Sequence, residues 1–223
     1  DAVIIGEVWE NASDKVAYGK RRKYLRGRQL DSVMNYPFRT AVIEFLLHKN
    51  ARAMADELTE IYASYPKCVS DSLMNIIGTH DTERILTVLS GENKYDLPNE
   101  KLARVRMSDE SRERAKRLLK LAAVTQFTVY GVPSVYYGDE AGMEGYHDPF
   151  CRMPYPWGRE DEELVALYRL LGRIRRENKV FEGGTFRVLH ADGAFLMFER
   201  RSAHECVTVA LNAGGTECAL GIA

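Results

Sequence analysis

Carboxylates occur at three places in the sequence where a short apolar run gives way to polar residues. Glu7 follows the first of these runs, the pair His80-Asp81 follows another, and Asp139-Glu140 follows a third. In parallel α/β folds, active-site groups lie at the carboxyl ends of the strands. A single acid at a strand end is more often a loop residue or a helix cap. A Glu and a His-Asp pair arriving from separate strands favour a shared site.

These residue types indicate glycoside hydrolysis. In that reaction one carboxylic acid protonates the leaving oxygen, and a second carboxylate attacks the sugar or stabilises an oxocarbenium-like transition state. Trp9 and Tyr146 are candidate surfaces on which sugar rings stack, although core packing is an equally good interpretation for Tyr146. No metal centre is predicted, because the four cysteines are scattered and no histidine has metal-ligand spacing.

The composition excludes several other functions. The 223 residues are 45% hydrophobic and 28% charged with a formal net charge of −1, so a core can form but no binding to nucleic acid or to an anionic membrane is predicted. The basic stretch 20–28 is interpreted as a solvated loop. No apolar run reaches the ~20 residues of a membrane span. Scattered cysteines favour a reducing compartment, so we predict a cytoplasmic location.

The elements that would position these residues alternate between strands and helices over residues 1–179. Apolar runs and helical periodicity predict four strands, at 2–8, 32–35, 73–78 and 133–137, and four helices, at 40–49, 52–62, 108–127 and 161–178. Residues 180–223 change to strands alone, at 186–189, 194–199 and 206–211, with Asp192-Gly193 as a hairpin turn. We therefore expect an α/β region followed by an antiparallel β region.

Two architectures agree with this pattern. Four strands, each followed by helical sequence, could form a small doubly wound sheet or half of an eight-stranded barrel. A complete barrel takes about 250 residues, more than the alternating region provides. Composition and periodicity do not distinguish the two.

Several motifs, in one order along the chain, resemble the α-amylase family, glycoside hydrolase family 13. The motifs are GEVW at 6–9, THD at 79–81, and GVPSVYYGDE at 131–140. They resemble the ends of the fifth, seventh and eighth barrel strands. MNYP at 34–37 and HDTER at 80–84 resemble the branch of neopullulanase, cyclomaltodextrinase and maltogenic amylase. The resemblance covers nearly the whole chain. It implies the C-terminal half of a (β/α)8 TIM barrel, strands 5–8, followed by part of an antiparallel β domain.

The resemblance also implies roles for individual residues. Glu7 would be the general acid/base, Asp81 would stabilise the transition state, and His80 would bind the sugar in subsite −1. Trp9 would lie on the +1 side, with Asp148 and Arg152 toward the −2 and −3 sugars, although each could equally hold its loop by an Arg–carboxylate pair. The predicted substrate-binding residues are therefore His80, Trp9, Arg84, Tyr146, Asp148 and Arg152.

The implied activity is retaining hydrolysis of α-1,4-glucans such as maltooligosaccharides, cyclomaltodextrins, pullulan or starch. The family's nucleophilic Asp belongs to strand four, and no Gly-x-Arg-x-Asp segment occurs in this sequence. We therefore expect the nucleophile upstream of residue 1, and a fragment that is inactive alone. Open barrel edges predict self-association or a homodimer. No cofactor is expected, and any calcium would be held by upstream residues.

Three alternatives differ in function. The chain could belong to an exo-acting α-glucosidase or oligo-1,6-glucosidase of the same family. It could instead belong to a non-catalytic amylase-like interaction protein, although the joint presence of Glu7, His80 and Asp81 argues against this. A doubly wound nucleotide-binding sheet lacks any glycine-rich phosphate loop after a strand.

Overall fold

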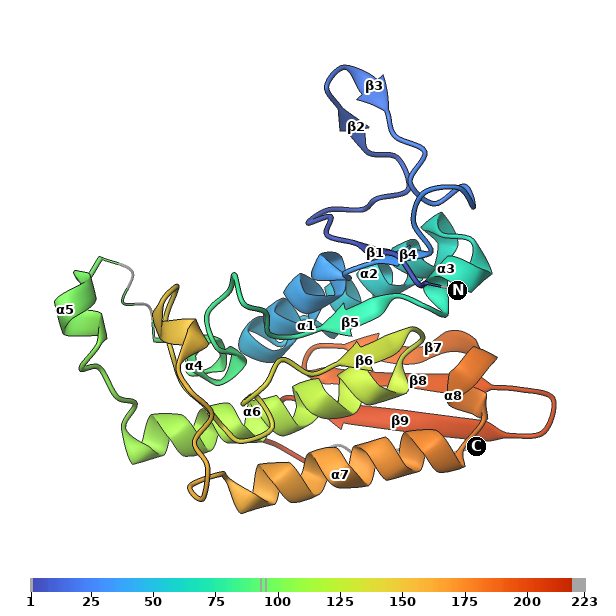
Figure 1. Ribbon diagram of the computed structural model, residues 1–223. Helices are drawn as coiled ribbons and strands as arrows, with labels where there is room; N and C mark the ends of the chain where they lie inside the picture. The colour runs from blue at the N-terminus through green and yellow to red at the C-terminus, as the bar shows by residue number, and fades with distance from the viewer. Residues whose placement is uncertain (1, 93, 95, 218–223) are drawn as a thin grey trace.

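The computed structural model describes residues 2–92, 94 and 96–217. Short parallel strands and helices form the N-terminal part, and an antiparallel sheet forms the C-terminal part (Figure 1). The strands are β1 (Ile5–Gly6), β2 (Val16–Ala17), β3 (Lys20–Arg21), β4 (Ser32–Val33), β5 (Met74–Ile76), β6 (Val132–Ser134), β7 (Thr185–Asp192), β8 (Phe195–Arg201) and β9 (Cys206–Asn212). The helices are α1 (Tyr36–His48), α2 (Ala51–Ser64), α3 (Lys67–Ser70), α4 (Ile85–Leu89), α5 (Asn99–Leu102), α6 (Asp109–Thr128), the 3-10 helix η1 (Phe150–Arg152), α7 (Glu162–Glu177) and α8 (Val180–Gly183).

The four predicted parallel strands are present and lie side by side in sequence order. β1 pairs with β4 and β5 pairs with β6, both in parallel. A parallel bridge between Met34 and Met74 joins the two pairs. Successive parallel neighbours are the arrangement found in β/α barrels. Assignment to barrel strands five to eight stays a prediction.

Buried amide side chains hold these short strands in register. Asn35, after β4, donates to Asn75 Oδ1 at 2.9 Å, and Asn75 in β5 donates to the carbonyl of Tyr130 at 2.6 Å. Gln126 of α6 donates to the carbonyls of Asn75 and Ser134 at 3.0 and 2.8 Å. A buried amide without partners would cost free energy, so these bonds fix how the strand ends meet.

The helices begin at side-chain caps. Ser108 accepts from the amide of Ser111 at the start of α6, as the sequence predicts. Helix α1 begins at Tyr36 rather than at residue 40, because Asn35 caps it and proline is tolerated in its first turn. None of the helices in the described residues is long and apolar enough to cross a membrane.

The C-terminal sheet shares a core with the helices. β8 pairs with both β7 and β9, and Leu196 and Phe198 belong to the same buried cluster as Met54 and Leu58 of α2. The turn between β7 and β8 falls one residue later than predicted, with Gly193 at φ +51°. The division of the chain near residue 180 stays a prediction, and residues 218–223 lie outside the described part.

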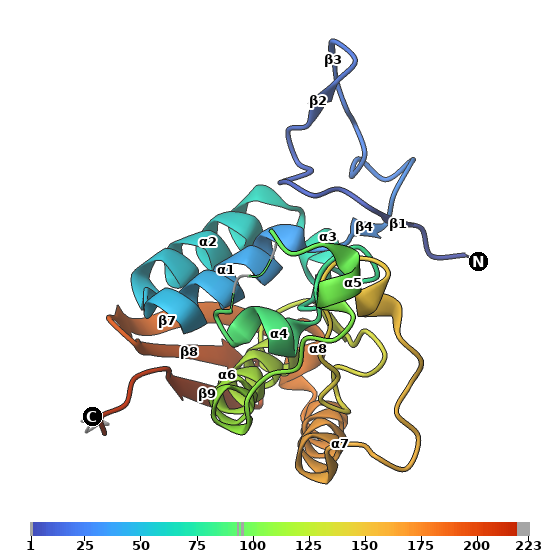
Figure 2. The same ribbon diagram turned by 90° about the vertical axis from the view of Figure 1, so that its left-hand side faces the viewer.

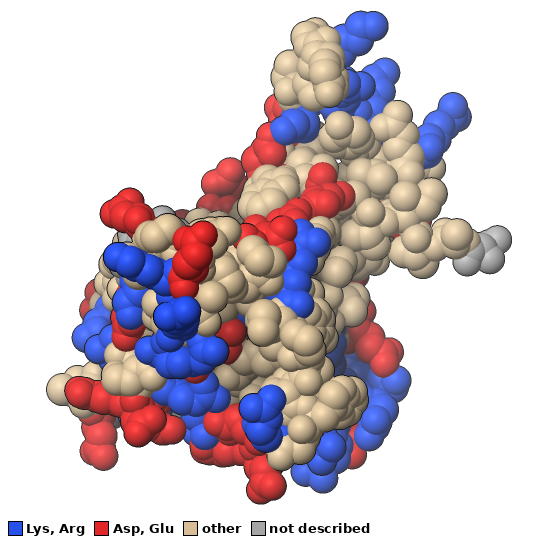
Figure 3. All heavy atoms as spheres, turned by 60° about the vertical axis from the view of Figure 1, so that its left-hand side comes forward, with Lys and Arg blue, Asp and Glu red and all other residues tan. Residues whose placement is uncertain are grey.

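The start of the predicted basic loop pairs with the residues before it in a hairpin. β2 and β3 pair in antiparallel fashion through Tyr18 and Gly19, whose φ angles are +53° and +71°. Positive φ at both central positions is what a tight hairpin turn requires. The hairpin projects from the body of the molecule (Figures 1 and 2). Basic side chains gather on it, whereas both signs of charge are mixed over the rest of the face in Figure 3.

The two outermost parallel strands leave apolar side chains exposed. Ile4 and Ile5 are exposed at β1, and Val132 and Val135 at β6. This exposure agrees with the open edges that the sequence predicts. A homodimer stays a prediction.

Candidate active site

Two segments that are far apart in the sequence, one with Glu7 and one with His80 and Asp81, converge in space. The ligand atoms of Glu7, His80 and Asp81 (two carboxylates and one imidazole) all lie within 4.8 Å of one another. Glu7 directly follows β1, and the His80-Asp81 pair follows β5. All three are exposed to solvent. The expected meeting of a Glu with a His-Asp pair from separate strands is thus present.

A compact turn holds His80 and Asp81. Thr79 donates its amide to Thr82 Oγ1 at 3.1 Å, and the amide of Asp81 donates to Thr79 Oγ1 at 3.2 Å. The Thr79 hydroxyl therefore orders the backbone of the turn.

Tyr36 joins the site, although its side chain was not among the predicted site residues. Its hydroxyl donates to Glu7 Oε1 at 3.0 Å, and its ring stacks on Trp9 with centroids 4.0 Å apart. Burial and the charges of Glu7 and Asp81 raise the pKa of Tyr36 to about 12, although a hydrogen bond with Thr79 opposes the shift. The phenol therefore stays a donor at neutral pH. Its signal in the sequence is its position immediately after a strand, within the MNYP motif.

Arg152 connects Asp148, a predicted substrate-binding residue, to the turn that carries the predicted catalytic residue Asp81. Its guanidinium lies 3.0 Å from Asp81 Oδ1 and 2.9 Å from Asp148 Oδ1. It also donates to the carbonyl of His80 at 3.0 Å. His80 Nε2 lies 3.4 Å from Asp81 Oδ2. These contacts favour the interpretation in which an Arg–carboxylate pair holds the loop, and they place Asp148 and Arg152 beside the site.

The remaining predicted contacts are divided between surface and interior. Trp9 is 52% exposed and stacks on Tyr36, so it presents aromatic surface at the site. Tyr146 is 6% exposed, which favours core packing over sugar stacking. The Arg84 side chain has no exposed surface. Its predicted role as a direct sugar ligand is therefore not supported, because a buried carboxylate, Asp139, and two tyrosine rings surround its guanidinium.

The donor set also has the composition of a weak divalent-ion site. Two carboxylates and one imidazole suit several transition metals. Exposed acids are common without an ion, however, and glycoside hydrolysis uses such carboxylates as free acid and base. We assign no metal role to the cluster.

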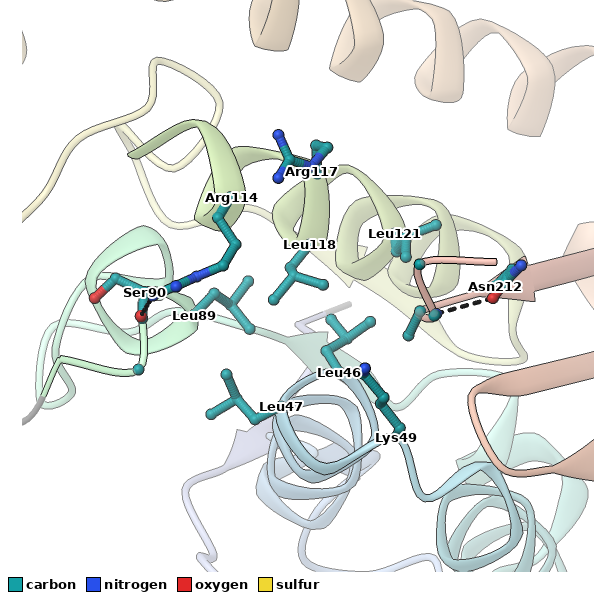
Figure 4. Close-up of a pocket in the computed structure, with 14 residues that line it drawn as sticks. Leu46, Leu47, Lys49, Leu89, Ser90, Arg114, Arg117, Leu118, Leu121 and Asn212 are labelled. Atoms are coloured by element: carbon teal, nitrogen blue, oxygen red, sulfur yellow. Dashed lines mark hydrogen bonds between the residues drawn. The ribbon is translucent and has the colours of Figure 1, made fainter. Parts of the chain in front are cut away.

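A cavity of about 590 Å³ lies elsewhere, between α1, α4, α6 and the end of β9 (Figure 4). Leucine side chains from α1 and α6 point into it. The described residues that line it include neither a carboxylate nor an imidazole. Through its described lining residues, this cavity therefore offers no acid or base of the kind found in the cluster around Glu7.

Comparison with known proteins agrees with this geometry. Residues 1–182 match the family model "Alpha amylase, catalytic domain". The chain is 38% identical to a cyclomaltodextrinase of Thermoanaerobacter pseudethanolicus over 216 residues, which are 95% of this chain and 32% of that protein. It is 39% identical to an amylopullulanase of Thermoanaerobacter thermohydrosulfuricus, covering 90% of this chain and 13% of that protein. It is 35% identical to neopullulanase 2 of Thermoactinomyces vulgaris, covering 96% and 32%.

Solved structures give the same result. A cyclomaltodextrinase aligns with a TM-score of 0.75 and 33% identity, covering 94% of this chain and 32% of its own. A debranching enzyme from Nostoc punctiforme aligns with a TM-score of 0.77 and 27% identity, covering 96% and 41%. The chain thus spans at most about a third of the curated relatives named here. The chain belongs to the α-amylase catalytic-domain family.

Proposed function

We propose that these residues form part of a retaining glycoside hydrolase that acts on α-1,4-linked glucans. The observation that carries the proposal is the convergence of Glu7, His80 and Asp81 within 4.8 Å at the ends of two strands. Relatives named cyclomaltodextrinase, amylopullulanase and neopullulanase support an α-glucan substrate. Cyclomaltodextrins, maltooligosaccharides and pullulan are therefore the substrates to test.

In the proposed mechanism, Glu7 protonates the glycosidic oxygen as the bond breaks and later activates a water molecule. Tyr36 holds the Glu7 carboxyl by its hydrogen bond. Asp81 stabilises the positive charge that develops on the sugar ring, and Arg152 fixes the Asp81 carboxylate in place. His80 donates to a hydroxyl of the same sugar. Trp9 offers a stacking surface for the leaving sugar.

Retention also requires a nucleophilic carboxylate about 5–5.5 Å from the acid. We assign it to an aspartate outside these 223 residues, because no Gly-x-Arg-x-Asp segment occurs in them. These residues alone should therefore show no turnover. The short separation of Asp81 and Glu7 makes Asp81 the candidate nucleophile if they do turn over.

The first experiment measures sugar release from β-cyclodextrin, pullulan and maltotriose. The full-length protein and the 223 residues are compared, each with Glu7→Gln. Replacing the acid should lower kcat by about 10²–10⁴-fold. Glu10→Gln is the matched control, since Glu10 is an exposed acid in the same segment that pairs with Lys15. Near-normal turnover by the Glu7 variant would refute the assignment.

The substrates also separate the alternatives. A closed β-cyclodextrin ring has no chain end, so its cleavage requires attack on an internal bond. Cleavage of maltotriose alone would favour the exo-acting α-glucosidase. Inactivity of a folded full-length protein on all three would favour a non-catalytic family member.

A further inference from the structure

A buried ion pair lies next to the turn that carries His80 and Asp81. Arg84 Nη1 and Asp139 Oδ1 are 3.4 Å apart, and neither side chain has exposed surface. Buried charges are rarely retained without a partner, and removing one partner leaves the other uncompensated. The mechanism proposed above gives neither residue a task.

The Asp139 carboxylate contacts both ends of the segment 78–84. At one end it pairs with Arg84. At the other end it lies against the backbone of Gly78, where an added Cβ would come within 2.3 Å of Asp139 Oδ2. Only glycine fits at that separation. The five residues between these two contacts include both His80 and Asp81.

Arg84 is itself held from several directions. Its guanidinium lies 4.4 and 4.6 Å from the ring centroids of Tyr136 and Tyr137, and it donates to the carbonyl of Tyr137. Its backbone amide donates to the carbonyl of Gly145 at 2.9 Å. Aromatic faces attract a desolvated cation. The end of the segment is thus fixed to the loop that follows β6.

We propose that Asp139 is a positioning residue that holds both ends of the segment 78–84 and so sets the place of Asp81 opposite Glu7. Asp139 touches no substrate and acts only through this segment. The expected effect on the hydrolysis rate rests on the proposed function, whereas the expected effect on the order of segment 78–84 does not. Displacement of a catalytic group by about 1 Å can cost about 10²-fold in rate.

The test compares Asp139→Ala with Asp139→Asn in the full-length protein. The Ala variant should lower kcat and kcat/KM by the same factor, about 10–100-fold, because the lost positioning acts in the transition state. Asparagine keeps the size of the side chain and one acceptor for Arg84, so it should restore kcat to within about threefold of wild type. Asp161→Ala, which removes the cap of α7, is the control that loses stability but keeps kcat.

Amide hydrogen exchange provides a readout that does not depend on hydrolysis. In Asp139→Ala, the amides of residues 79–84 should exchange faster, while those of α7 and of β7–β9 keep their wild-type protection. Gly78→Ala should produce the same local change from the opposite end. In the double variant the two changes in exchange at 79–84 should be less than additive, because both substitutions disrupt the same contact between Asp139 and Gly78.

The outcomes separate this inference from the proposed function. Suppose that Asp139→Ala speeds exchange at 79–84 but the full-length protein hydrolyses none of the glucans. This result would support the positioning role of Asp139 and refute the proposed glycoside hydrolase activity. Unchanged exchange at 79–84 in a folded Asp139→Ala variant would overturn the positioning role of Asp139, whatever the hydrolytic activity. The positioning role would also be overturned if the changes in exchange caused by Gly78→Ala and by Asp139→Ala were fully additive in the double variant.

Discussion

The Tyr36→Phe substitution removes one hydroxyl from the proposed acid and leaves the aromatic ring in place. The hydroxyl donates a hydrogen bond of 3.0 Å to Glu7 Oε1, and the ring stacks on Trp9 with centroids 4.0 Å apart. Phenylalanine keeps the stacking surface. The variant therefore isolates the contribution of the hydrogen bond.

The size of the effect follows from the surroundings of Glu7. A hydrogen bond to a charged group contributes about 1.5–3 kcal/mol. Glu7 is exposed, so water competes for its carboxylate and the lower limit applies. About 1.5 kcal/mol corresponds to about a tenfold decrease in kcat/KM. Burial chiefly raises the pKa of Tyr36 to about 12, so the decrease should be the same from about pH 5 to about pH 9.

The assay is kcat/KM on β-cyclodextrin as a function of pH, with thermal unfolding to verify the fold. Tyr18→Phe is the matched control, because Tyr18 is 95% exposed at the tip of the β2–β3 hairpin, where its ring lies against Arg22. A decrease of less than about twofold would refute the reasoning. So would a decrease that disappears toward pH 9, since the phenol would then not be the donor.

Three further variants test other contacts. Arg152→Ala should lower kcat about tenfold, because Asp81 loses the guanidinium that holds it, and steady-state kinetics measure this effect. The free energy of unfolding should change by less than about 1 kcal/mol, because the ion pair is exposed, and thermal unfolding measures this change. Burial raises the pKa of Asp139 to about 7, although Arg84 opposes the shift, so the folded state keeps a proton that the unfolded chain releases. The free energy of unfolding should therefore decrease as pH rises from about 4 to about 7, and denaturant titrations should show a flatter dependence in Asp139→Asn. Asp161→Ala should cost about 1 kcal/mol of stability, seen as a lower Tm, with unchanged kcat.

The strand ends and the helix starts could be predicted from local sequence. Apolar runs followed by polar residues placed Glu7 and the His80-Asp81 pair at one edge, because parallel strands bring their carboxyl ends together. Ser108 could be predicted as a cap, since its hydroxyl can bond to the free amides of its own helix. These features depend on neighbours within a few positions.

Other features depend on contacts that local sequence does not encode. The buried position of Arg84 follows from Asp139, which lies 55 residues later in the chain. Tyr36 becomes part of the site because β1 lies beside β4. The β2–β3 hairpin was missed because Tyr18, a residue other than glycine, takes a positive φ in its turn. Tertiary packing decides the first two, whereas the hairpin is local and has a tyrosine at a turn position that glycine usually takes.

The common core of the C-terminal sheet and helix α2 limits how this fold can be recombined. Leu196 and Phe198 of β8 belong to the same buried cluster as Met54 and Leu58 of α2, so separating the sheet from the helix would expose apolar side chains of both. Deleting the sheet would uncover the apolar face of α2, and grafting the sheet onto another protein would require a matching helix. Evolutionary exchange of this sheet between relatives should therefore carry α2 along with it, as one inherited unit.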